Sequence, residues 1–254
     1  MNNSGELELI KKISDLADRA FRTNRITETL FLNPSETATA QNFLRSKSGV
    51  RFLIHGGFPD SERSRLFFLP DYIDEEYFPI EEYISVIKTK FSFSSPTHRD
   101  FLGSLMGLGI KREVLGDILV FPDRAYIICT AQIAQYIVEN LEKVGRLGIQ
   151  SSVVSLSEIE IPTPQFDTVT GTVASLRADS VTALAFGISR TFAAELISSG
   201  ALSLNHLPEE NISAEIQEGD LLSLRGYGRA KLFAIGGISK KGRHFLELQV
   251  FSKK

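Results

Sequence analysis

The sequence has few of the residues that cross-link small folds through disulfides or bind soft metals. Its 254 residues contain one cysteine, Cys129, and no tryptophan. A single cysteine cannot form an intrachain disulfide, which fits a reducing compartment. We expect Cys129 to be a small core residue. Four histidines are scattered without metal-ligand spacing, so we predict no metal site and no cofactor. These are His55, His98, His206 and His244.

Long apolar runs and targeting signals are also missing. The longest apolar stretch, from Tyr126 to Val138, is interrupted by polar residues, and crossing a bilayer takes about 20 apolar residues. The first six residues, Met-Asn-Asn-Ser-Gly-Glu, have neither the basic nor the apolar region of a signal peptide. We therefore predict a cytoplasmic protein, a monomer without a membrane partner.

Composition and element patterns predict an α+β fold in several parts. Hydrophobic residues make up 43% and charged residues 23% of the chain, as in ordinary folded proteins. We expect an N-terminal α/β domain over 1–82 and a ferredoxin-like, RRM-like domain over 83–160. A linker or an edge strand follows over 161–174, and an αα-β domain with a basic C-terminal extension over 175–254.

In the first segment, the spacing of apolar residues predicts an amphipathic helix over 6–22. A second helix is expected to begin near Asn33-Pro34, capped by Ser35, and to end near Arg45. Short apolar runs over 51–55 and 65–69 predict strands. The acidic stretch over 71–82 lacks the spacing of a calcium loop, so we expect a solvated loop.

The second segment has the pattern of a βαββαβ unit, the order that RNA-recognition modules use. We expect strands over 83–91, 116–121, 124–130 and 149–156, and helices over 97–108 and 131–144. An RNA-recognition module stacks bases on exposed aromatic residues, whereas 123–130 offers only Tyr126. Lys111 and Arg112 are either secondary RNA contacts or the start of a surface strand. We expect Gly116 to permit close packing and Asp117 to tie a turn.

Charge is unevenly distributed along the chain. The formal net charge is −3, but from residue 225 onward eight cations face one acid, Glu247. These cations are Arg225, Arg229, Lys231, Lys240, Lys241, Arg243, Lys253 and Lys254. Such a basic cluster is typical of a phosphate-binding surface. It is equally typical of a solvated sheet edge whose lysines prevent strand pairing.

The third segment begins with two short helices. Residues 175–187 predict a helix with a glycine stop, and residues 189–200 predict a second one, capped by Ser189 and closed by Gly200. Phe192, Ala193, Leu196 and Ile197 are expected to form its apolar stripe. Strands over 201–205 and 221–225 follow. A helix N-terminus beside Arg190 attracts phosphate, because free amides and a forked cation point the same way.

This arrangement resembles the S-four RNA-binding domain, named for a small-subunit ribosomal protein. The matching residues keep the spacing of the family pattern, with Ala178 and His206 as departures. They are Arg177, Asp179, Ser189, Arg190, Ala193, Ile197 or its neighbour Leu196, Gly200, Leu202, Leu204, Asn205, Gly219 and Asp220.

Glycine-rich and basic motifs also occur over 109–118, 225–231 and 240–243. With these stretches the chain resembles the YlmH family of bacterial proteins, which are encoded near cell-division genes and carry an S-four domain behind two other domains. The resemblance implies RNA binding at the large ribosomal subunit, with ribosomal RNA and tRNA as partners. It also implies a part in ribosome-associated quality control.

The sequence lacks the motifs of the enzymes that carry S-four domains. Gly148 stands where a pseudouridine synthase has its aspartate, and no glycine-rich nucleotide fingerprint follows a strand. No Gly-x-Ser-x-Gly elbow occurs either. We therefore predict a binding protein without a catalytic residue. The alternative is a protein-interaction scaffold linked to cell division.

The predicted RNA-binding residues centre on the start of the second helix and extend along the basic tail. They are Arg177, Ser189, Arg190, Thr191, Asn205, His206, Arg225, Tyr227, Arg229, Lys231, Lys240, Lys241 and Arg243.

Overall fold

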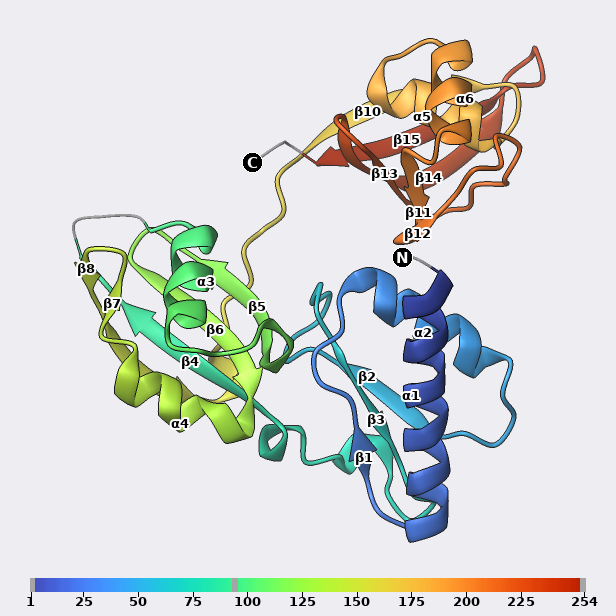
Figure 1. Ribbon diagram of the computed structural model, residues 1–254. Coiled ribbons are helices and arrows are strands. Elements are labelled where there is room, and N and C mark those ends of the chain that lie inside the picture. The colour runs from blue at the N-terminus through green and yellow to red at the C-terminus, as the bar shows by residue number, and fades with distance from the viewer. Residues whose placement is uncertain (1–2, 93–95, 252–254) are drawn as a thin grey trace. The chain divides into compact units, whose positions relative to one another are not determined.

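The computed structural model describes residues 3–92 and 96–251, and it shows a mixed helix and sheet fold. The chain divides into two compact units, Met1–Pro162 and Thr163–Lys254 (Figure 1). The predicted α+β class is therefore confirmed at that level. Lys253 and Lys254 of the predicted basic tail lie outside the described residues.

The first unit opens with two helices over a small sheet. The helices are α1 (Asn3–Thr23) and α2 (Pro34–Arg45), and the antiparallel sheet has the order β1 (Thr27–Glu28), β3 (Arg65–Phe68), β2 (Phe52–His55). Ile13 and Leu44 of the helices pack with Leu66 and Phe68 of the sheet. Both helices and both longer strands were expected from the sequence.

The cap of α2 differs from the prediction. Asn33, not Ser35, caps the helix: its Oδ1 accepts a bond from the Glu36 amide at 2.9 Å, and the Glu36 carboxylate accepts one from the Asn33 amide at 2.8 Å. Proline has no amide hydrogen and suits the first helical position. Pro34 therefore places the cap one residue before itself.

The rest of the first unit is a four-stranded antiparallel sheet with the order β5-β6-β4-β9. Helices α3 and α4 pack on one face, as the green elements of Figure 1 show. The βαββαβ order is the predicted one. The elements are β4 (Ile84–Lys90), α3 (His98–Gly107), β5 (Leu115–Val120), β6 (Arg124–Thr130), α4 (Ala131–Asn140) and β9 (Gln150–Val154). Among the described residues, short 3-10 helices precede β4 (Glu75–Tyr77 and Ile80–Glu82), connect α3 to β5 (Arg112–Val114) and follow β9 (Leu156–Glu158).

Helix α4 is shorter than predicted. It ends at Asn140 instead of Val144, and a small hairpin follows, formed by β7 (Lys143–Val144) and β8 (Leu147–Gly148). Gly145 has φ +61°, the left-handed conformation that a two-residue hairpin turn requires. The glycine therefore forms a turn between strands and does not stop the helix.

The other face of the four-stranded sheet packs on the preceding segment. Val86 and Ile128 from this face share a buried cluster with Phe31, Phe67 and Phe78. Gly116 lies at the same contact, where an added Cβ would stand 2.9 Å from both Ile128 and Phe31. The prediction of close packing at Gly116 is confirmed. A domain boundary at residue 82 stays a prediction, and a shared core joins the segments on its two sides.

We predict that Gly116→Ala lowers the free energy of unfolding of the first unit by about 1–3 kcal/mol, since an extra methyl overfills the core. Gly103 provides the control, because it lies within α3 with no atom near its added Cβ. Gly103→Ala should stabilise the helix by about 0.5–1 kcal/mol. Chemical denaturation followed by circular dichroism measures both. Equal effects of the two changes would contradict the packing.

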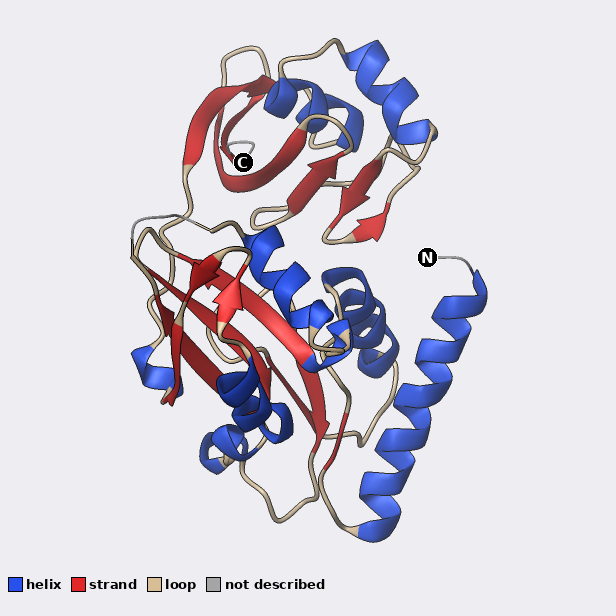
Figure 2. Ribbon diagram, turned by 60° about the vertical axis from the view of Figure 1, so that its left-hand side comes forward, coloured by secondary structure: helices blue, strands red, loops and turns tan. Residues whose placement is uncertain are grey.

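The second unit is a six-stranded sheet covered by two helices. Its strand order is β10-β15-β14-β13-β11-β12, and Figure 2 shows the long strands curling. Val181 and Ile197 of the helices pack on Leu222, Leu232 and Leu248 of the sheet. The elements are β10 (Phe166–Val173), α5 (Ala178–Phe186), α6 (Arg190–Ser198), β11 (Leu202–Leu204), β12 (Leu207–Pro208), β13 (Leu221–Leu224), β14 (Gly228–Ile238) and β15 (His244–Phe251).

The segments before and after the two helices both belong to the sheet of this unit. Residues 166–173 form the edge strand β10, so of the two alternatives, a linker or an edge strand, the edge strand is correct for these residues. The basic extension forms β14 and β15, in which the buried Ala230, Leu232, Leu246 and Leu248 alternate with more exposed residues. A period of two is typical of a sheet with one buried face.

Candidate nucleic-acid interface

A buried carboxylate holds two arginines at the starts of α5 and α6. Asp179 accepts hydrogen bonds from Arg190 Nε at 2.9 Å and from Arg177 Nε and Nη2 at 3.3 and 3.4 Å. The Asp179 side chain is 6% exposed, whereas Arg190 is 54% and Arg177 36% exposed. We call these three residues the arginine clamp. Two cations around one anion leave it a net positive charge, directed to solvent.

Electrostatics keep Asp179 ionised. Burial raises its pKa, but the hydrogen bonds and positive charges of Arg177 and Arg190 outweigh burial, so the pKa lies below the usual 3.8. A carboxyl with a depressed pKa stabilises the fold above its unfolded pKa, and this contribution is lost as the pH falls through the folded pKa.

We predict that Asp179→Asn destabilises the second unit by about 1–3 kcal/mol at neutral pH, since the arginines lose a charged acceptor. The difference from wild type should be constant above about pH 5 and shrink below the usual Asp pKa of about 3.9. Thermal unfolding between pH 2 and 7 measures it. A difference that does not change with pH would show that Asp179 is not the titrating partner.

The start of α6 is built as the sequence predicts. Ser189 caps it, accepting a bond from the Phe192 amide at 3.2 Å, and Thr191 is exposed. The predicted apolar stripe is correct at Ala193 and Ile197, which are buried, but Phe192 is 41% exposed. Phe192 is a candidate contact that the sequence prediction missed, because helical periodicity assigned it to the core.

The turn between β13 and β14 lies beside α6. The ring of Tyr227 contacts Phe186 and Phe192, with centroids 6.2 and 6.5 Å apart. Arg225, in the same turn, is exposed. The structure therefore groups Tyr227 with the first turn of α6, where two aromatic rings accompany the exposed cations.

Asn205 and His206 lie in a tight turn after β11. Both have left-handed backbone, with φ of +48° and +70°. The side chain of Asn205 accepts from the Leu221 amide at 2.9 Å and donates to Asp220 Oδ1 at 2.7 Å. Asn205 thus fastens this turn to the start of β13. Its spacing to Gly219-Asp220 reflects a structural tie, and contact with RNA stays a prediction for both residues.

The remaining predicted cations of the tail fall into two further groups. Arg229 and Lys231 are exposed on β14, while Lys240 and Lys241 occupy the turn that follows this strand. In the same turn, Arg243 donates to Thr172 Oγ1 at 2.9 Å and to the Thr172 carbonyl, which fastens it to β10. The β13–β14 turn and the β14–β15 turn lie at opposite ends of the eleven-residue β14. The predicted residues therefore do not form one compact patch.

In the first unit, Arg112 has an internal role. It donates to the carbonyls of Leu115 and Gly116 at 2.9 and 3.1 Å. Burial, together with the charge of Arg63, lowers its pKa to about 10, although Asp117 opposes the shift. Lys111 is exposed and keeps the secondary contact as a prediction. Asp117 accepts from the backbone amides of residues 62 and 63, which confirms that it ties a turn.

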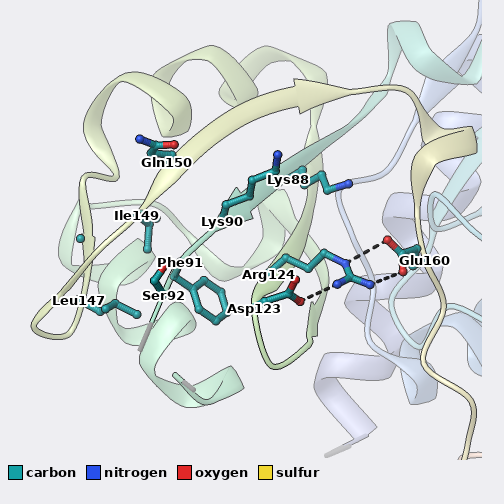
Figure 3. Close-up of a pocket in the computed structure, with 11 residues that line it drawn as sticks. Lys88, Lys90, Phe91, Ser92, Asp123, Arg124, Leu147, Ile149, Gln150 and Glu160 are labelled. Carbon is teal, nitrogen blue, oxygen red and sulfur yellow. Dashed lines mark hydrogen bonds and ion pairs between the residues drawn. The ribbon is translucent and has the colours of Figure 1, made fainter. Parts of the chain in front are cut away.

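An open cleft of about 1130 Å³ lies on the four-stranded sheet, at its end near β7 and β8 (Figure 3). Lys88 and Lys90 line it from β4. Arg124 is paired with Asp123 and Glu160. The ring of Tyr126 is fully buried, and its hydroxyl donates to Glu160 at 2.9 Å. Tyr126 is therefore not available to stack a base there, and no other aromatic residue lies in the four strands of this sheet.

Two family models match within the first unit. Residues 5–73 match a family model described as "YlmH, N-terminal", and residues 75–158 one described as "Putative RNA-binding domain in YlmH". Over 233 residues the chain is 31% identical to the Bacillus subtilis (strain 168) protein named "Ribosome-associated protein quality control protein P2", with 89% of this chain and 90% of that protein covered. The chain belongs to the YlmH family.

The chain is also similar to a solved structure, the "Cell division protein ylmH from Streptococcus pneumoniae". The two are 29% identical, the match covers 61% of this chain and 90% of the solved chain, and the TM-score is 0.47. The cleft of Figure 3 lies mostly within the YlmH range 75–158, whereas the arginine clamp lies beyond both matched ranges.

Two further findings concern the described residues of this YlmH protein. No group of three or more histidine, cysteine, aspartate or glutamate side chains there is placed to hold a metal ion. No single helix in that part of the chain has the length and apolar content to cross a membrane. The pair α5 and α6 passes on length and composition only when taken together, and a bend of 115° separates the two.

Proposed function

We propose that this protein is a non-catalytic RNA-binding protein that associates with the ribosome in the cytoplasm. Its partner is structured RNA, either ribosomal RNA of the large subunit or tRNA held there. Ribosome-associated quality control is the proposed process, supported by the name of the Bacillus subtilis relative. The observation that carries the proposal is the arginine clamp, two exposed guanidinium groups fixed by one buried carboxylate.

The second unit is proposed to be an S-four domain with the clamp as its RNA-binding centre. Helices α5 and α6 followed by β11 have the order of that motif, and Asp179 and Asn205 make ties within the unit. A phosphate at the start of α6 would meet the free amides of the first turn and the helix dipole. Arg190 adds a planar fork that matches two phosphate oxygens.

We predict that Arg190→Ala weakens binding to structured ribosomal RNA or tRNA about ten-fold to a hundred-fold, since a charge-assisted contact contributes about 1.5–3 kcal/mol. Arg190→Lys should restore only part of the affinity, because it keeps the charge without the fork. Arg19→Ala is the matched control: Arg19 is an exposed arginine on α1, in the other unit. Filter binding with the full chain measures all three.

Unchanged RNA affinity in a folded Arg190→Ala protein would contradict the clamp as the RNA site. Binding to ribosomes that persists after nuclease treatment would point to the alternative, a protein-interaction scaffold linked to cell division. In that case the basic residues of the second unit serve as a solvated edge.

Lys240 and Lys241, in the turn between β14 and β15, should contribute to the affinity for RNA but not to the choice of RNA. If about six phosphates are neutralised, log affinity against log salt has a slope of about −4 to −5. We predict that replacing Lys240 and Lys241 together by alanine makes the slope shallower by about 1–2, with no change in which RNA is preferred. Titrations between 50 and about 300 mM salt test this. A changed RNA preference would show that these lysines read specific features.

A further inference from the structure

The sheet of the second unit has a second face, turned away from α5 and α6. We call it the outer face. Strand residues alternate between the faces, and the buried Ala230, Leu232, Leu246 and Leu248 point to the helices. The residues between them point outward. Those on the three longest strands are Phe166, Thr168, Thr170, Thr172, Arg229, Lys231, Phe233, Phe245, Glu247, Gln249 and Phe251.

The outer face displays aromatic rings that the core of the unit does not use. Phe233 is 53%, Phe245 50% and Phe166 41% exposed. A register shift between Leu232 and Ala234 inserts Phe233 as an extra residue in β14. Gly236 lies beside Phe245, where an added Cβ would stand 3.2 Å from the Phe245 Cβ. Glycine at this position therefore leaves room around that ring.

Cations are placed among these rings by the strand register. Phe166 on β10 pairs with Phe251 on β15, which pairs with Arg229 on β14. The two rings are 6.4 Å apart in an edge-to-face arrangement, and the Arg229 guanidinium lies 5.8 Å from the centroid of Phe251. The next row places Lys231 beside Gln249 and Thr168. Glu247 lies on the same face of β15, and the carboxylate of Glu218 accepts a hydrogen bond from the Ile235 amide of β14.

We propose that the outer face binds unpaired RNA, with bases stacked on the phenylalanine rings and the phosphate backbone along Arg229 and Lys231. Sheets that bind single strands combine exposed aromatic rings with cations, because every base has a face to stack and every nucleotide a charge. Threonine and glutamine side chains between the rings supply hydrogen bonds to bases and sugars. This inference rests on the proposed function, RNA binding, but uses a surface distinct from the arginine clamp.

Charge favours RNA over an apolar protein partner as the occupant. A surface for an apolar partner is expected to be depleted in charge at its centre. Here Arg229 and Lys231 lie in the same rows as threonine and glutamine side chains between the rings. The outer face thus provides for stacking and for phosphate neutralisation together.

The test uses the full chain and a fluorescein-labelled uridine decamer, with an abasic decamer as the backbone-only probe. Fluorescence anisotropy should show that the uridine decamer binds at least about ten-fold more tightly than the abasic one, since stacking contributes to each base. The double variant Phe233→Ala/Phe245→Ala should lose about ten-fold to a hundred-fold in uridine affinity. Phe245→Tyr should retain it, because the ring remains.

Phe21→Ala is the matched control, since Phe21 is 84% exposed on α1 in the other unit. It should leave decamer binding unchanged. Lys231→Ala should make the salt slope shallower by about 0.7, the value for one phosphate of a single strand. Circular dichroism on each variant checks that the fold is kept, as expected for exposed rings.

Arg190→Ala separates the two surfaces. It should weaken binding to structured RNA while leaving decamer affinity within about two-fold. Equal affinity for the uridine and abasic decamers, or unchanged uridine binding by the folded double variant, would overturn the stacking surface. Neither result would contradict the arginine clamp as the site for structured RNA. If Arg190→Ala still binds structured RNA as tightly as the wild type does, while the double variant no longer binds the decamer, the clamp is overturned as the RNA site. The proposal for the outer face then stands. A wild-type chain that binds neither decamer would also overturn the inference.

Discussion

The second unit depends on one interaction, the carboxylate of Asp179 between Arg177 and Arg190. A carboxylate that is 6% exposed must have charged partners, and here both partners come from helix starts. The interaction fixes α5 against α6 and aims two guanidinium groups at solvent. The same contact therefore stabilises the fold and shapes the surface. Because the two arginines have only one acid between them, positive charge remains for a phosphate.

Local signals in the sequence predict most elements of the fold. Apolar spacing identifies the long helices, and Gly187 and Gly200 mark the ends of α5 and α6 through left-handed backbone at φ +62° and +72°. Predictions are incomplete where the chain makes non-local pairs. The sequence leaves 161–174 as a linker or an edge strand, and only the pairing of β10 with β15, from Phe166 with Phe251 to Val173 with His244, decides for the strand. Val144 belongs to a hairpin because Gly145 turns the chain, although its periodicity also fits a helix.

The candidate site is predicted in part for the same reason. Residue type and helix position identify Arg177, Ser189 and Arg190, which the structure brings to one place. Sequence alone cannot show that the Asn205 side chain is hydrogen-bonded to Asp220 and to the Leu221 amide. Nor can it show that the Arg112 side chain donates to backbone carbonyls. Nor does it reveal the outer face, since only the register of three strands places Phe166, Phe233 and Phe245 on the same face of one sheet.

The first unit shows why topology alone does not determine a binding mode. Its sheet has the element order of RNA-recognition modules, yet Tyr126 is buried and Arg124 is paired with Asp123 and Glu160. The central claim, RNA binding through the clamp, is tested most directly by co-sedimentation of the full chain with purified large ribosomal subunits. We expect nuclease-sensitive co-sedimentation that falls steeply with salt and is weakened about ten-fold to a hundred-fold in Arg190→Ala. Co-sedimentation that resists both nuclease and this substitution would contradict the account.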